Sequence, residues 1–464
     1  MQVPIIRGVY ADTSGNIRAA LPVNYEPVVV QSGVSDGYMR PADGIVEFTT
    51  GPGADRLGIN WNGRVFRAMG TKLVEVDRVG RVTEIGDIGG QTMASFDYGF
   101  DRMSVVSDGR FFYYDGESLT EVTDEDLLSV VDHIWIDGYY LLTDGQYLIV
   151  TDLNDPTQIN ALKYGSAEID PDGIVGVEKL RNEAWAIGRY TSEVFDNVGG
   201  SLFPFARIDG AHVPIGAVGT HAKCVFMEAI AVLGGGKNEP VCVHMMASGQ
   251  SRKISNDEVD WVLSQYTESE LASSILESRS HNGRHALYVH LPDRTLVFDA
   301  EASKQMEQPV WSILTSSMQG YSKYKARGFV LAFNKWICGS DDGKIGYLDE
   351  SVGTHYGEHV RTELTTLMLY NGSRSAIVHE MELVALTGRM ALADDARISS
   401  SYSVDGVTWS QPRTIAVGRQ GNRSKRLCWL ANGMLRNWRI QRFSGDSRSH
   451  ISVMRLEVRI EGLS

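Results

Sequence analysis

Four Asp-Gly pairs between Asp101 and Asp152 divide this stretch into short runs of Val, Ile, Phe, Tyr and Leu. The pairs occupy positions 108–109, 115–116, 137–138 and 144–145. Asp-Gly between such runs favours an antiparallel hairpin, because a type I′ turn needs positive φ at both central residues. The runs are about five to seven residues long, the usual length of a strand, and leave no room for crossover helices. The stretch therefore predicts a series of antiparallel hairpins.

The same alternation of short apolar runs and turn residues continues along the chain. It occurs at 56–85, 176–194, 224–246, 285–299 and 329–349. Irregular blocks of roughly 40–50 residues, with about four strands each, match the blade period of a β-propeller. We predict an all-β fold with a six- or seven-bladed β-propeller over 56–360. One long β-sandwich array is the alternative, and the ring is favoured because it leaves few strand edges exposed.

The two ends of the chain have a different composition. Residues 1–55 contain five prolines and many glycines, and proline is excluded from central strands. We therefore predict an extended N-terminal arm with short strands, laid over a neighbouring domain or subunit. Near the other end, Met454, Leu456 and Val458 alternate with charged residues, which predicts strands with one buried and one solvated face. Residues 361–464 are predicted to form a separate C-terminal β-sandwich.

One helical segment interrupts the strands. Capping and acidic residues at 255–258 precede Val259, Val262 and Leu263, which follow one another at helical spacing. We expect a helix there and a further turn or two over 271–277. Both would lie between blades.

Sequence motifs for catalysis, cofactors and metals are missing. Four cysteines are spread along the chain: Cys224, Cys242, Cys338 and Cys428. They form no Cys-x-x-Cys pair, so we expect buried small side chains in a reducing cytosol, and neither a zinc site nor disulfides. The glycine run at 234–237 lacks the Ser or Thr of a phosphate loop. We predict no catalytic, cofactor or metal residues. No apolar run approaches the roughly 18 residues of a membrane span, and the start does not have the pattern of a signal peptide.

The segment 403–409 resembles the Asp-box turn of sialidase-like propellers. It is one residue short and occurs once, whereas such enzymes repeat it across blades. The Asp of such a turn caps its own hairpin and the Trp packs beneath it, so we predict a structural role, and we expect the paired acids at 394–395 in a solvated loop. A propeller glycosidase or glycan-binding protein is the alternative function. The residues predicted to form structural turns are Asp108, Gly109, Asp144, Gly145, Asp342, Gly343, Asp405, Gly406 and Trp409.

The charge is unevenly distributed. The net charge is -14, which argues against a basic protein that wraps nucleic acid. Residues 401–464 hold eleven Lys or Arg and four Asp or Glu, a net charge of +7, so residues 1–400 carry -21. Two separately solvated domains would explain this difference, and so would two oppositely charged faces that meet different partners. The residues predicted to face a partner are Arg419, Arg423, Lys425 and Arg426.

Ten segments, taken in their order along the chain, resemble a known family. They are 3–10, 21–24, 38–45, 254–260, 282–284, 288–292, 295–300, 339–346, 401–409 and 427–430, together with Trp311. The chain resembles the packaged-DNA stabilisation proteins, also called tail hub or nozzle proteins, of short-tailed bacteriophages. The likeness spans most of its length.

This resemblance implies a virion structural protein, assembled in the host cytoplasm and carried in the virion tail. Six copies would form a ring below the portal and its adaptor protein. The ring would carry the tail needle or plug, seat the tail fibres or tailspikes, close the channel after packaging and pass double-stranded DNA on infection. An acidic wall would suit such a conduit, because a basic wall binds phosphates. The basic C-terminal part would either face an acidic partner ring or line the channel.

Overall fold

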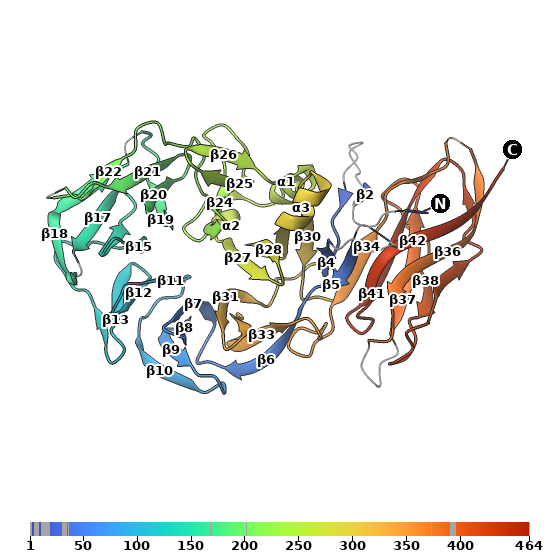
Figure 1. The fold of residues 1–464 in the computed structure, drawn as a ribbon, viewed down its shortest axis with the longest axis horizontal. Helices are drawn as coiled ribbons and strands as arrows, with labels where there is room; N and C mark the ends of the chain where they lie inside the picture. The colour runs from blue at the N-terminus through green and yellow to red at the C-terminus, as the bar shows by residue number, and fades with distance from the viewer. Residues whose placement is uncertain are drawn as a thin grey trace. The chain divides into compact units, whose positions relative to one another are not determined.

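The computed structural model describes residues 2–3, 9–10, 19–29, 35, 37–153, 155–167, 169–200, 202–372, 374–389 and 396–463. These residues form two compact units (Figure 1). Unit 1 comprises 1–46, 293–324 and 349–464, and unit 2 comprises 47–292 and 325–348. Across the described residues, no helix is long and apolar enough to span a membrane.

Seven four-stranded sheets succeed one another along the chain. The first three are β7 (Asp55–Trp61), β8 (Arg64–Met69), β9 (Lys72–Val76) and β10 (Val82–Asp87); β11 (Ser95–Tyr98), β12 (Met103–Ser107), β13 (Arg110–Tyr114) and β14 (Leu119–Glu121); and β15 (Asp132–Ile136), β16 (Tyr139–Thr143), β17 (Tyr147–Asp152) and β18 (Asp155–Ser166). The next two are β19 (Ile174–Leu180), β20 (Glu183–Gly188), β21 (Ser192–Asn197) and β22 (Phe205–Arg207); and β23 (Lys223–Phe226), β24 (Ala229–Gly234), β25 (Cys242–Ala247) and β26 (Gln250–Lys253). The last two are β27 (Ile275–His281), β28 (Arg284–His290), β29 (Thr295–Asp299) and β30 (Val310–Leu314); and β31 (Arg327–Ala332), β32 (Lys335–Gly339), β33 (Lys344–Asp349) and β6 (Gly44–Thr50).

The first strands of these sheets close into a ring. β7, β11, β15, β19, β23, β27 and β31 contact one another in this order, and β31 contacts β7 again. This arrangement is a β-propeller, with the higher of the two blade numbers predicted from the sequence (Figure 1). The seventh blade takes its outer strand, β6, from the N-terminal part of the chain. Next to this strand, the N–H of Gly51 donates to the carbonyl of Gly343 at 2.9 Å.

Apolar side chains fill the spaces between neighbouring blades. Trp61 and Phe66 of the first blade pack with Phe112 and Tyr114 of the second, and Trp185 of the fourth packs with residues of the fifth, with none of its surface exposed. Such layers follow from the alternation of side chains along each strand, which gives every blade two apolar faces. Burial on both faces holds the ring together.

The four Asp-Gly pairs of the sequence lie in hairpin turns of two kinds. Asp108 and Gly109 have φ of 53° and 81°, and Asp137 and Gly138 have φ of 51° and 89°, as a type I′ turn requires. At 115–116 and 144–145 only the glycine has positive φ. There the aspartate accepts backbone hydrogen bonds instead, for example from Gln146 N at 2.8 Å to Asp144 Oδ1.

Three short helices lie in the described residues: α1 (Asp257–Leu263), α2 (Glu268–Ala272) and α3 (Ala300–Met306). α1 begins where the sequence predicts it, with Asn256 Oδ1 accepting from Val259 N at 3.1 Å. The expected turn over 271–277 is wrong, because a capping box at Thr267 starts α2 earlier and β27 begins at Ile275. Both α1 and α2 lie between the fifth and sixth blades in the chain, as predicted.

Unit 1 contains a β-sandwich, which confirms the fold predicted for the C-terminal part. One sheet has the order β39-β36-β42-β5-β4, with β1 added to β42 and β40 to β36; the other has the order β34-β41-β37-β38, with β35 added to β41. The bounds of the first sheet are β39 (Leu427–Leu430), β36 (Ala376–Leu386), β42 (Ser452–Gly462), β5 (Tyr38–Pro41), β4 (Tyr25–Val28), β1 (Gln2–Val3) and β40 (Met434–Leu435). Those of the second are β34 (Arg361–Thr365), β41 (Trp438–Asp446), β37 (Arg397–Ser403), β38 (Arg413–Ala416) and β35 (Leu369–Tyr370); β2 (Val9–Tyr10) and β3 (Ala19–Ala20) form a separate pair.

The core of the sandwich joins residues from both ends of the chain. Trp429 and Phe443 pack with Tyr25 and Met39 in one buried cluster. β4 and β5 therefore belong to this sheet, whereas the sequence predicts an extended arm over 1–55 with short strands laid over a neighbouring domain or subunit. The division into 1–55, 56–360 and 361–464 stays a prediction, because the boundaries of independently folding domains are not tested by these contacts.

Candidate functional site

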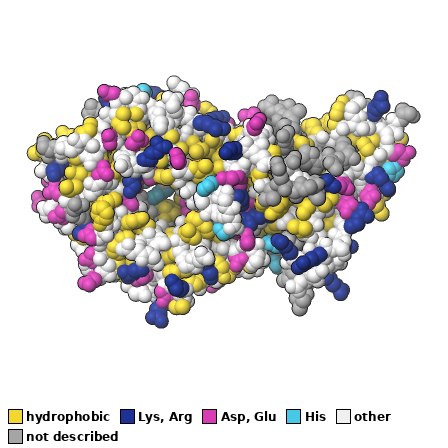
Figure 2. Space-filling view, in the orientation of Figure 1, with side chains coloured by type: hydrophobic (Ala, Val, Ile, Leu, Met, Phe, Trp, Pro, Cys, Tyr) yellow, Lys and Arg dark blue, Asp and Glu magenta, His cyan; other side chains and the backbone are white. Residues whose placement is uncertain are grey.

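The ring of blades encloses a hollow bore (Figure 2). A cavity of about 470 Å³ is lined by residues of all seven first strands, among them Asp97, Asp132, Glu178 and Glu277. A second cavity of about 580 Å³ is lined mainly by hydroxyl-bearing and small residues such as Ser129. The sequence analysis did not single out the charged side chains that line the bore.

Carboxylates in the bore bind the backbone of the next blade. Asp97 on β11 accepts from Trp135 N on β15 at 2.5 Å, and Asp132 on β15 accepts from Val177 N on β19 at 3.0 Å. Glu277 on β27 accepts from the N–H groups of Gly328 and Phe329 on β31, at 2.7 and 2.6 Å. The first strand of a blade has no further strand on its inner edge, so its N–H groups need such acceptors. These carboxylates link one blade to the next.

A buried lysine balances part of this negative charge. Lys223 Nζ lies 2.9 Å from Asp132 Oδ2 and 3.5 Å from Glu178 Oε2. Burial alone would raise the pKa of Asp132, but the Lys223 ammonium brings it below the ordinary value. Burial would likewise lower the pKa of Lys223, and the two carboxylates raise it above the ordinary value. Both groups are therefore charged at neutral pH.

The net pKa shifts of Asp97 and Glu277 have opposite signs. Burial raises the pKa of Asp97, and the ammonium of Lys179 only partly offsets this rise. Burial would also raise the pKa of Glu277, but hydrogen bonding to His290 and to the backbone of β31 holds it below the ordinary value. Glu277 is thus the more firmly ionised of the two.

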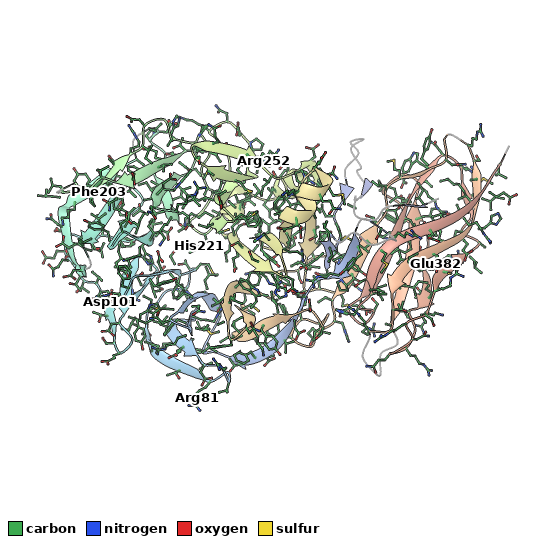
Figure 3. All side chains as sticks on the ribbon, in the orientation of Figure 1. Arg81, Asp101, Phe203, His221, Arg252 and Glu382 are labelled. Carbon is green, nitrogen blue, oxygen red and sulfur yellow. The ribbon has the colours of Figure 1, made fainter. Side chains whose placement is uncertain are left out.

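His221 crosses the bore. It precedes β23 of the fifth blade, and its ring is hydrogen-bonded to the backbone of Met93, which precedes β11 of the second blade. These blades are not neighbours in the ring, so this hydrogen bond runs from one wall to the other, and His221 is labelled in the middle of the ring in Figure 3. The histidine therefore borders both cavities, as Ser95 and Thr220 also do.

A Ser-His contact beside the bore is enclosed by protein. Ser104 Oγ and His133 Nε2 are 2.6 Å apart, but the two residues are 0% and 3% exposed. Burial, with a smaller contribution from Lys223, lowers the pKa of His133 to about 4 despite the opposing charge of Asp132. A nucleophile and base must meet a substrate, and these two side chains present almost no surface to one. The contacts of His133 with Phe111 and Tyr140 are those of a packed interior.

The Asp-box-like turn of the sandwich uses its carboxylate internally. Asp405 Oδ1 accepts from Val407 N and Thr408 N, both at 2.8 Å. Hydrogen bonding from Thr408 and the backbone holds the pKa of Asp405 well below its usual range. Trp409 is half-buried, and the guanidinium carbon of Arg442 lies 3.9 Å from the centre of its ring. The arrangement fixes a turn and leaves no carboxyl group that would act as a general acid.

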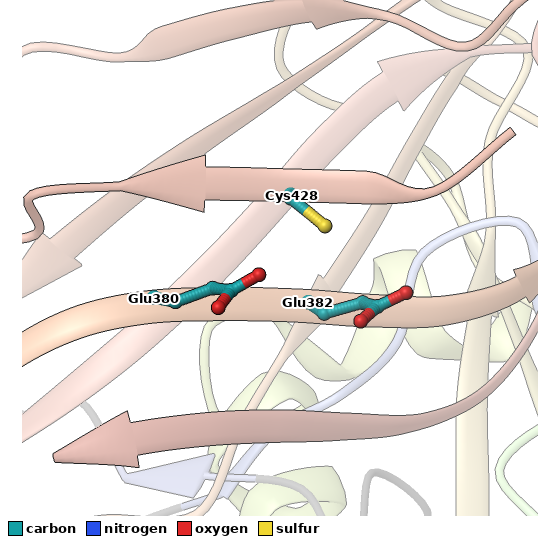
Figure 4. Close-up of side chains that lie close together, drawn as sticks. All are labelled: Glu380, Glu382 and Cys428. Carbon is teal, nitrogen blue, oxygen red and sulfur yellow. The ribbon is translucent and has the colours of Figure 1, made fainter.

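Among the described residues, one group of possible metal ligands lies on the sandwich (Figure 4). Glu380 and Glu382 project from β36 and Cys428 from the adjacent β39, with ligand atoms within 4.8 Å of one another. Arg426 already neutralises the acids, with Nε 2.9 Å from Glu382 Oε1 and Nη2 3.3 Å from Glu380 Oε1. Burial and the nearby Glu382 raise the pKa of the Cys428 thiol, and a protonated thiol is a poor ligand. The triad fits an ion-paired surface better than a zinc site.

The sequence analysis did not predict this triad. Its only signal is the Glu-x-Glu spacing, which places both acids on one face of a strand. The position of Cys428 follows from the pairing of Glu382 with it across β36 and β39. Cys242 and Cys338 are buried, whereas Cys224 and Cys428 are half-buried.

The turn residues predicted from the sequence do not converge on one site. Asp108 and Gly109 join β12 to β13, Asp144 and Gly145 join β16 to β17, and Asp342 and Gly343 join β32 to β33, while Asp405, Gly406 and Trp409 lie in the sandwich. The predicted partner-facing residues Arg419, Arg423 and Lys425 are exposed between β38 and β39, and Arg426 is exposed but ion-paired. The acids at 394–395 lie outside the described residues.

Two family models match the chain. The model described as "Bacteriophage P22 Gp10, beta-propeller" matches residues 1–353, and the model described as "Bacteriophage P22 Gp10, beta-sandwich" matches 361–461. The chain belongs to the family of bacteriophage P22 Gp10. The family resemblance in the sequence is thereby confirmed, although most of the segment 3–10 that contributes to it lies outside the described residues.

The similarity to one member of the P22 Gp10 family extends over the full length. The tail hub protein gp10 of Salmonella phage P22 is 25% identical in an alignment of 483 positions that covers 99% of each chain. Among solved structures, the N-terminal domain of Nup159 has a TM-score of 0.43 at 9% identity and covers 72% of this chain and 99% of its own. The Neurospora crassa Pan2 WD40 domain has a TM-score of 0.42 at 10% identity, with coverages of 68% and 98%. Both TM-scores are below 0.5, so the fold assignment rests on the sheets and the family models.

Proposed function

We propose that this protein is a virion structural protein, the tail hub of a short-tailed bacteriophage. The observation that carries the proposal is the match, over 99% of both chains, to a protein named as the tail hub of phage P22. The two family models support it, because they cover both the propeller and the sandwich. A likeness confined to the propeller would say little, since propellers serve many functions.

In this role six copies form a ring below the portal and its adaptor protein. The ring closes the channel after packaging, carries the tail needle or plug, seats the tail fibres or tailspikes and passes double-stranded DNA. The protein assembles in the host cytoplasm and ends in the virion tail. The closed ring of blades and its cross-linked bore support this role, because a hub has to stay rigid while other parts attach to it.

The proposed hub has no enzymatic activity. The carboxylates of the bore accept backbone hydrogen bonds from the neighbouring blade, and Asp405 does the same within its turn. A glycosidase needs two carboxyl groups that face a substrate. The acids in the bore instead hold neighbouring blades together through hydrogen bonds, so a glycosidase is disfavoured.

The three parts predicted from the sequence are assigned separate roles. Residues 56–360 supply most of the propeller and 361–464 most of the sandwich, while 1–55 connect them by adding strands to sheets of both. The pairing of β5 with β42 and the hydrogen bond between Gly51 and Gly343 support this connecting role.

A mass measurement tests the hub assignment. The purified full-length chain is measured by native mass spectrometry alone and after mixing with a portal–adaptor complex. We expect a defined complex that contains several copies of the chain on one portal–adaptor assembly. A chain that stays monomeric and never joins that assembly would contradict the proposal.

A further inference from the structure

Positive charge gathers at one end of the sandwich in unit 1. At this end β36 stops at Leu386, β38 stops at Ala416 and β39 begins at Leu427. We call the adjoining segments 386–389 and 417–426 the basic loops. Their exposed cations that form no ion pair with a described residue are Arg389, Arg419, Arg423 and Lys425. The chain as a whole has a net charge of -14, so the basic loops are a local exception.

The backbone holds the two basic loops against each other. The N–H of Gly421 donates to the carbonyl of Gly388 at 3.1 Å, and Thr387 Oγ1 donates to the carbonyl of Asn422 at 2.9 Å. Gly388 has a φ of 85°, and a Cβ atom on it would lie 3.0 Å from the backbone of Asn422, so this close approach favours glycine. The cations are thus carried on one preformed surface, which reduces the entropy lost on binding.

The surroundings of the basic loops do not offset their charge. The turn between β41 and β42 lies at the same end of the sandwich, because Leu386 of β36 pairs with Ser452 at the start of β42. That turn is electrically balanced, since Arg448 Nη2 lies 2.6 Å from Asp446 Oδ2. The charge of the basic loops is therefore left for a partner.

The sequence around the basic loops gives the same sign of charge. The segments 386–397 and 416–426 hold six Lys or Arg and two Asp, a net charge of +4. The two Asp are those at 394–395, which lie outside the described residues and are included in this net charge. Arg426 is ion-paired with Glu382 of β36, and without Arg426 a charge of +3 remains. A partner for this surface therefore has to be anionic.

The composition of the longer basic loop distinguishes between anionic partners. Residues 418–426 read Gly-Arg-Gln-Gly-Asn-Arg-Ser-Lys-Arg and contain no apolar side chain. Protein interfaces have an apolar and aromatic centre, and segments that bind lipid insert apolar side chains. Phosphate groups of nucleic acids are bound by Arg and Lys together with Ser, Asn and Gln. The loop fits the backbone of a nucleic acid better than an acidic protein or a lipid surface.

We propose that the basic loops bind the phosphate backbone of double-stranded DNA. Base sequence is read in the grooves by helices or β-ribbons, and the described residues of the basic loops form neither, so the contact is independent of sequence. A contact with a few phosphates is salt-sensitive and lets DNA slide. The proposal rests on the proposed function for the presence of DNA beside the hub, and it adds which residues contact that DNA.

Charge reversal on the longer basic loop tests the proposal in the full-length chain. The variants are R419E/R423E and Lys425→Ala. Fluorescence anisotropy measures their binding to a short labelled DNA duplex over a series of salt concentrations. A second duplex of unrelated sequence and labelled poly-L-glutamate are measured in the same way. Melting curves establish that each variant is folded.

The matched control reverses two arginines at the other end of the sandwich. Along β36, Leu383 pairs with Leu427 beside the basic loops, whereas Ala376 pairs with Leu435. Arg436 follows Leu435, and Arg374 precedes β36; both are exposed, and neither forms an ion pair with a described residue. R374E/R436E therefore changes the net charge of the chain as much as R419E/R423E does.

We expect R419E/R423E to weaken duplex binding at least about tenfold and R374E/R436E to change it less than about threefold. For the unmodified chain, the slope of log affinity against log salt should be about -3, because each neutralised phosphate contributes about 0.9. Lys425→Ala should reduce the size of this slope by about one and weaken binding to both duplexes alike. A purely structural role for Lys425 would leave the slope unchanged.

Three results would overturn the proposal: equal losses in R419E/R423E and R374E/R436E, no duplex binding by the unmodified chain at low salt, or tighter binding of poly-L-glutamate than of the duplex. The last result would assign the basic loops to an acidic protein. None of the three affects the hub assignment, which depends on whether the chain joins the portal–adaptor complex. A chain that binds the duplex but never joins that complex would contradict the hub and leave the DNA contact in place.

Discussion

The bore of the propeller and the surface of the sandwich around Arg374 and Arg436 use charge in opposite ways. In the bore, Asp132 and Glu277 bind the backbone of the next blade, and Lys223 is enclosed between carboxylates. On the sandwich, Arg374 and Arg436 are exposed, and neither forms an ion pair among the described residues. Charge that is satisfied internally fixes the shape of a subunit, whereas charge left at the surface is available to another molecule. A charged residue is therefore informative only when its partners are known.

The largest effect is expected at Asp132. Asp132→Ala leaves the Lys223 ammonium buried with only Glu178 nearby and removes the acceptor for Val177 N. Removing one partner of a buried ion pair costs about 3–5 kcal/mol. Denaturant unfolding followed by tryptophan fluorescence measures this loss. The control is Glu84→Ala, at an exposed position of β10. Equal stabilities of the two variants would show that the bore charges do not hold the blades together.

A pH effect of similar size is expected at His133. Burial, assisted by Lys223, lowers its pKa to about 4, whereas the unfolded chain binds the proton with the ordinary value of 6.5. Because the unfolded state binds this proton more readily, the contribution is fully present above pH 6.5 and is lost as the pH falls towards 4. The loss is roughly 3 kcal/mol. Unfolding curves between pH 7 and 4 measure it.

The matched comparison for His133 uses an exposed histidine. His133→Phe should flatten the pH dependence of stability between pH 6.5 and 4, whereas His212→Gln, at an exposed position, should leave it unchanged. His133→Phe also lowers stability at pH 7, because Ser104 loses one of its two hydrogen bonds and keeps only the one to the carbonyl of Asp97. If stability fell equally steeply with pH in both variants, groups other than His133 would account for the acid sensitivity of folding.

A smaller effect is expected for Glu277→Gln. The amide keeps one oxygen as an acceptor but turns an NH₂ group towards the N–H of Gly328 or Phe329. The loss of one hydrogen bond to a charged acceptor costs about 2 kcal/mol. Hydrogen exchange at the amides of β31 should rise more than at those of β19, which is distant from this substitution in the ring. An equal rise in hydrogen exchange at β31 and at β19 would contradict a local link between the sixth and seventh blades.

The smallest effect is expected for Arg426→Ala on the sandwich. Its guanidinium pairs with Glu382 and Glu380 but is largely exposed, and exposed ion pairs contribute little because water screens them. The melting temperature should change within experimental error, and increasing salt should not alter that result. A loss comparable with that of Asp132→Ala would mean that the sandwich, too, depends on its charges.

Local turn chemistry made the propeller predictable from the sequence. Asp108 and Gly109 have the positive φ angles that an Asp-Gly hairpin requires, and the strands on either side follow directly. The sequence left the number of blades open between six and seven, because three helices make the stretch around the sixth blade longer than the others. α1 and α2 precede its first strand, β27, and α3 lies between β29 and β30. The strands β5 and β6 were not predicted as members of the sheets, since their partners β42 and β33 lie about three to four hundred residues away and no local pattern encodes such pairing. β4 joins its sheet through β5.

The bore was not predicted because its residues look ordinary in the sequence. Asp97 and Asp132 each lie at or near the inner strand of a blade, surrounded by apolar or aromatic residues. An acid inside such a run is a usable signal, because a buried carboxylate must find a hydrogen-bond donor. What the sequence lacks is the identity of that donor, which belongs to the next blade. His221 is similar, since its partner Met93 follows from the closure of the ring.

The outer strand of the seventh blade also determines when the protein is able to finish folding. β6 is synthesised early, whereas its partner β33 is made about three hundred residues later. At about 5–20 residues per second, a ribosome needs roughly 15–60 s to cover that distance. During this interval β6 waits without its partner, and six blades remain an open arc with two free ends. Because β6 is made before β33, its free edge is able to pair with another nascent chain. A chaperone that covers β6, or rapid synthesis of the seventh blade, would therefore raise the yield of closed propellers.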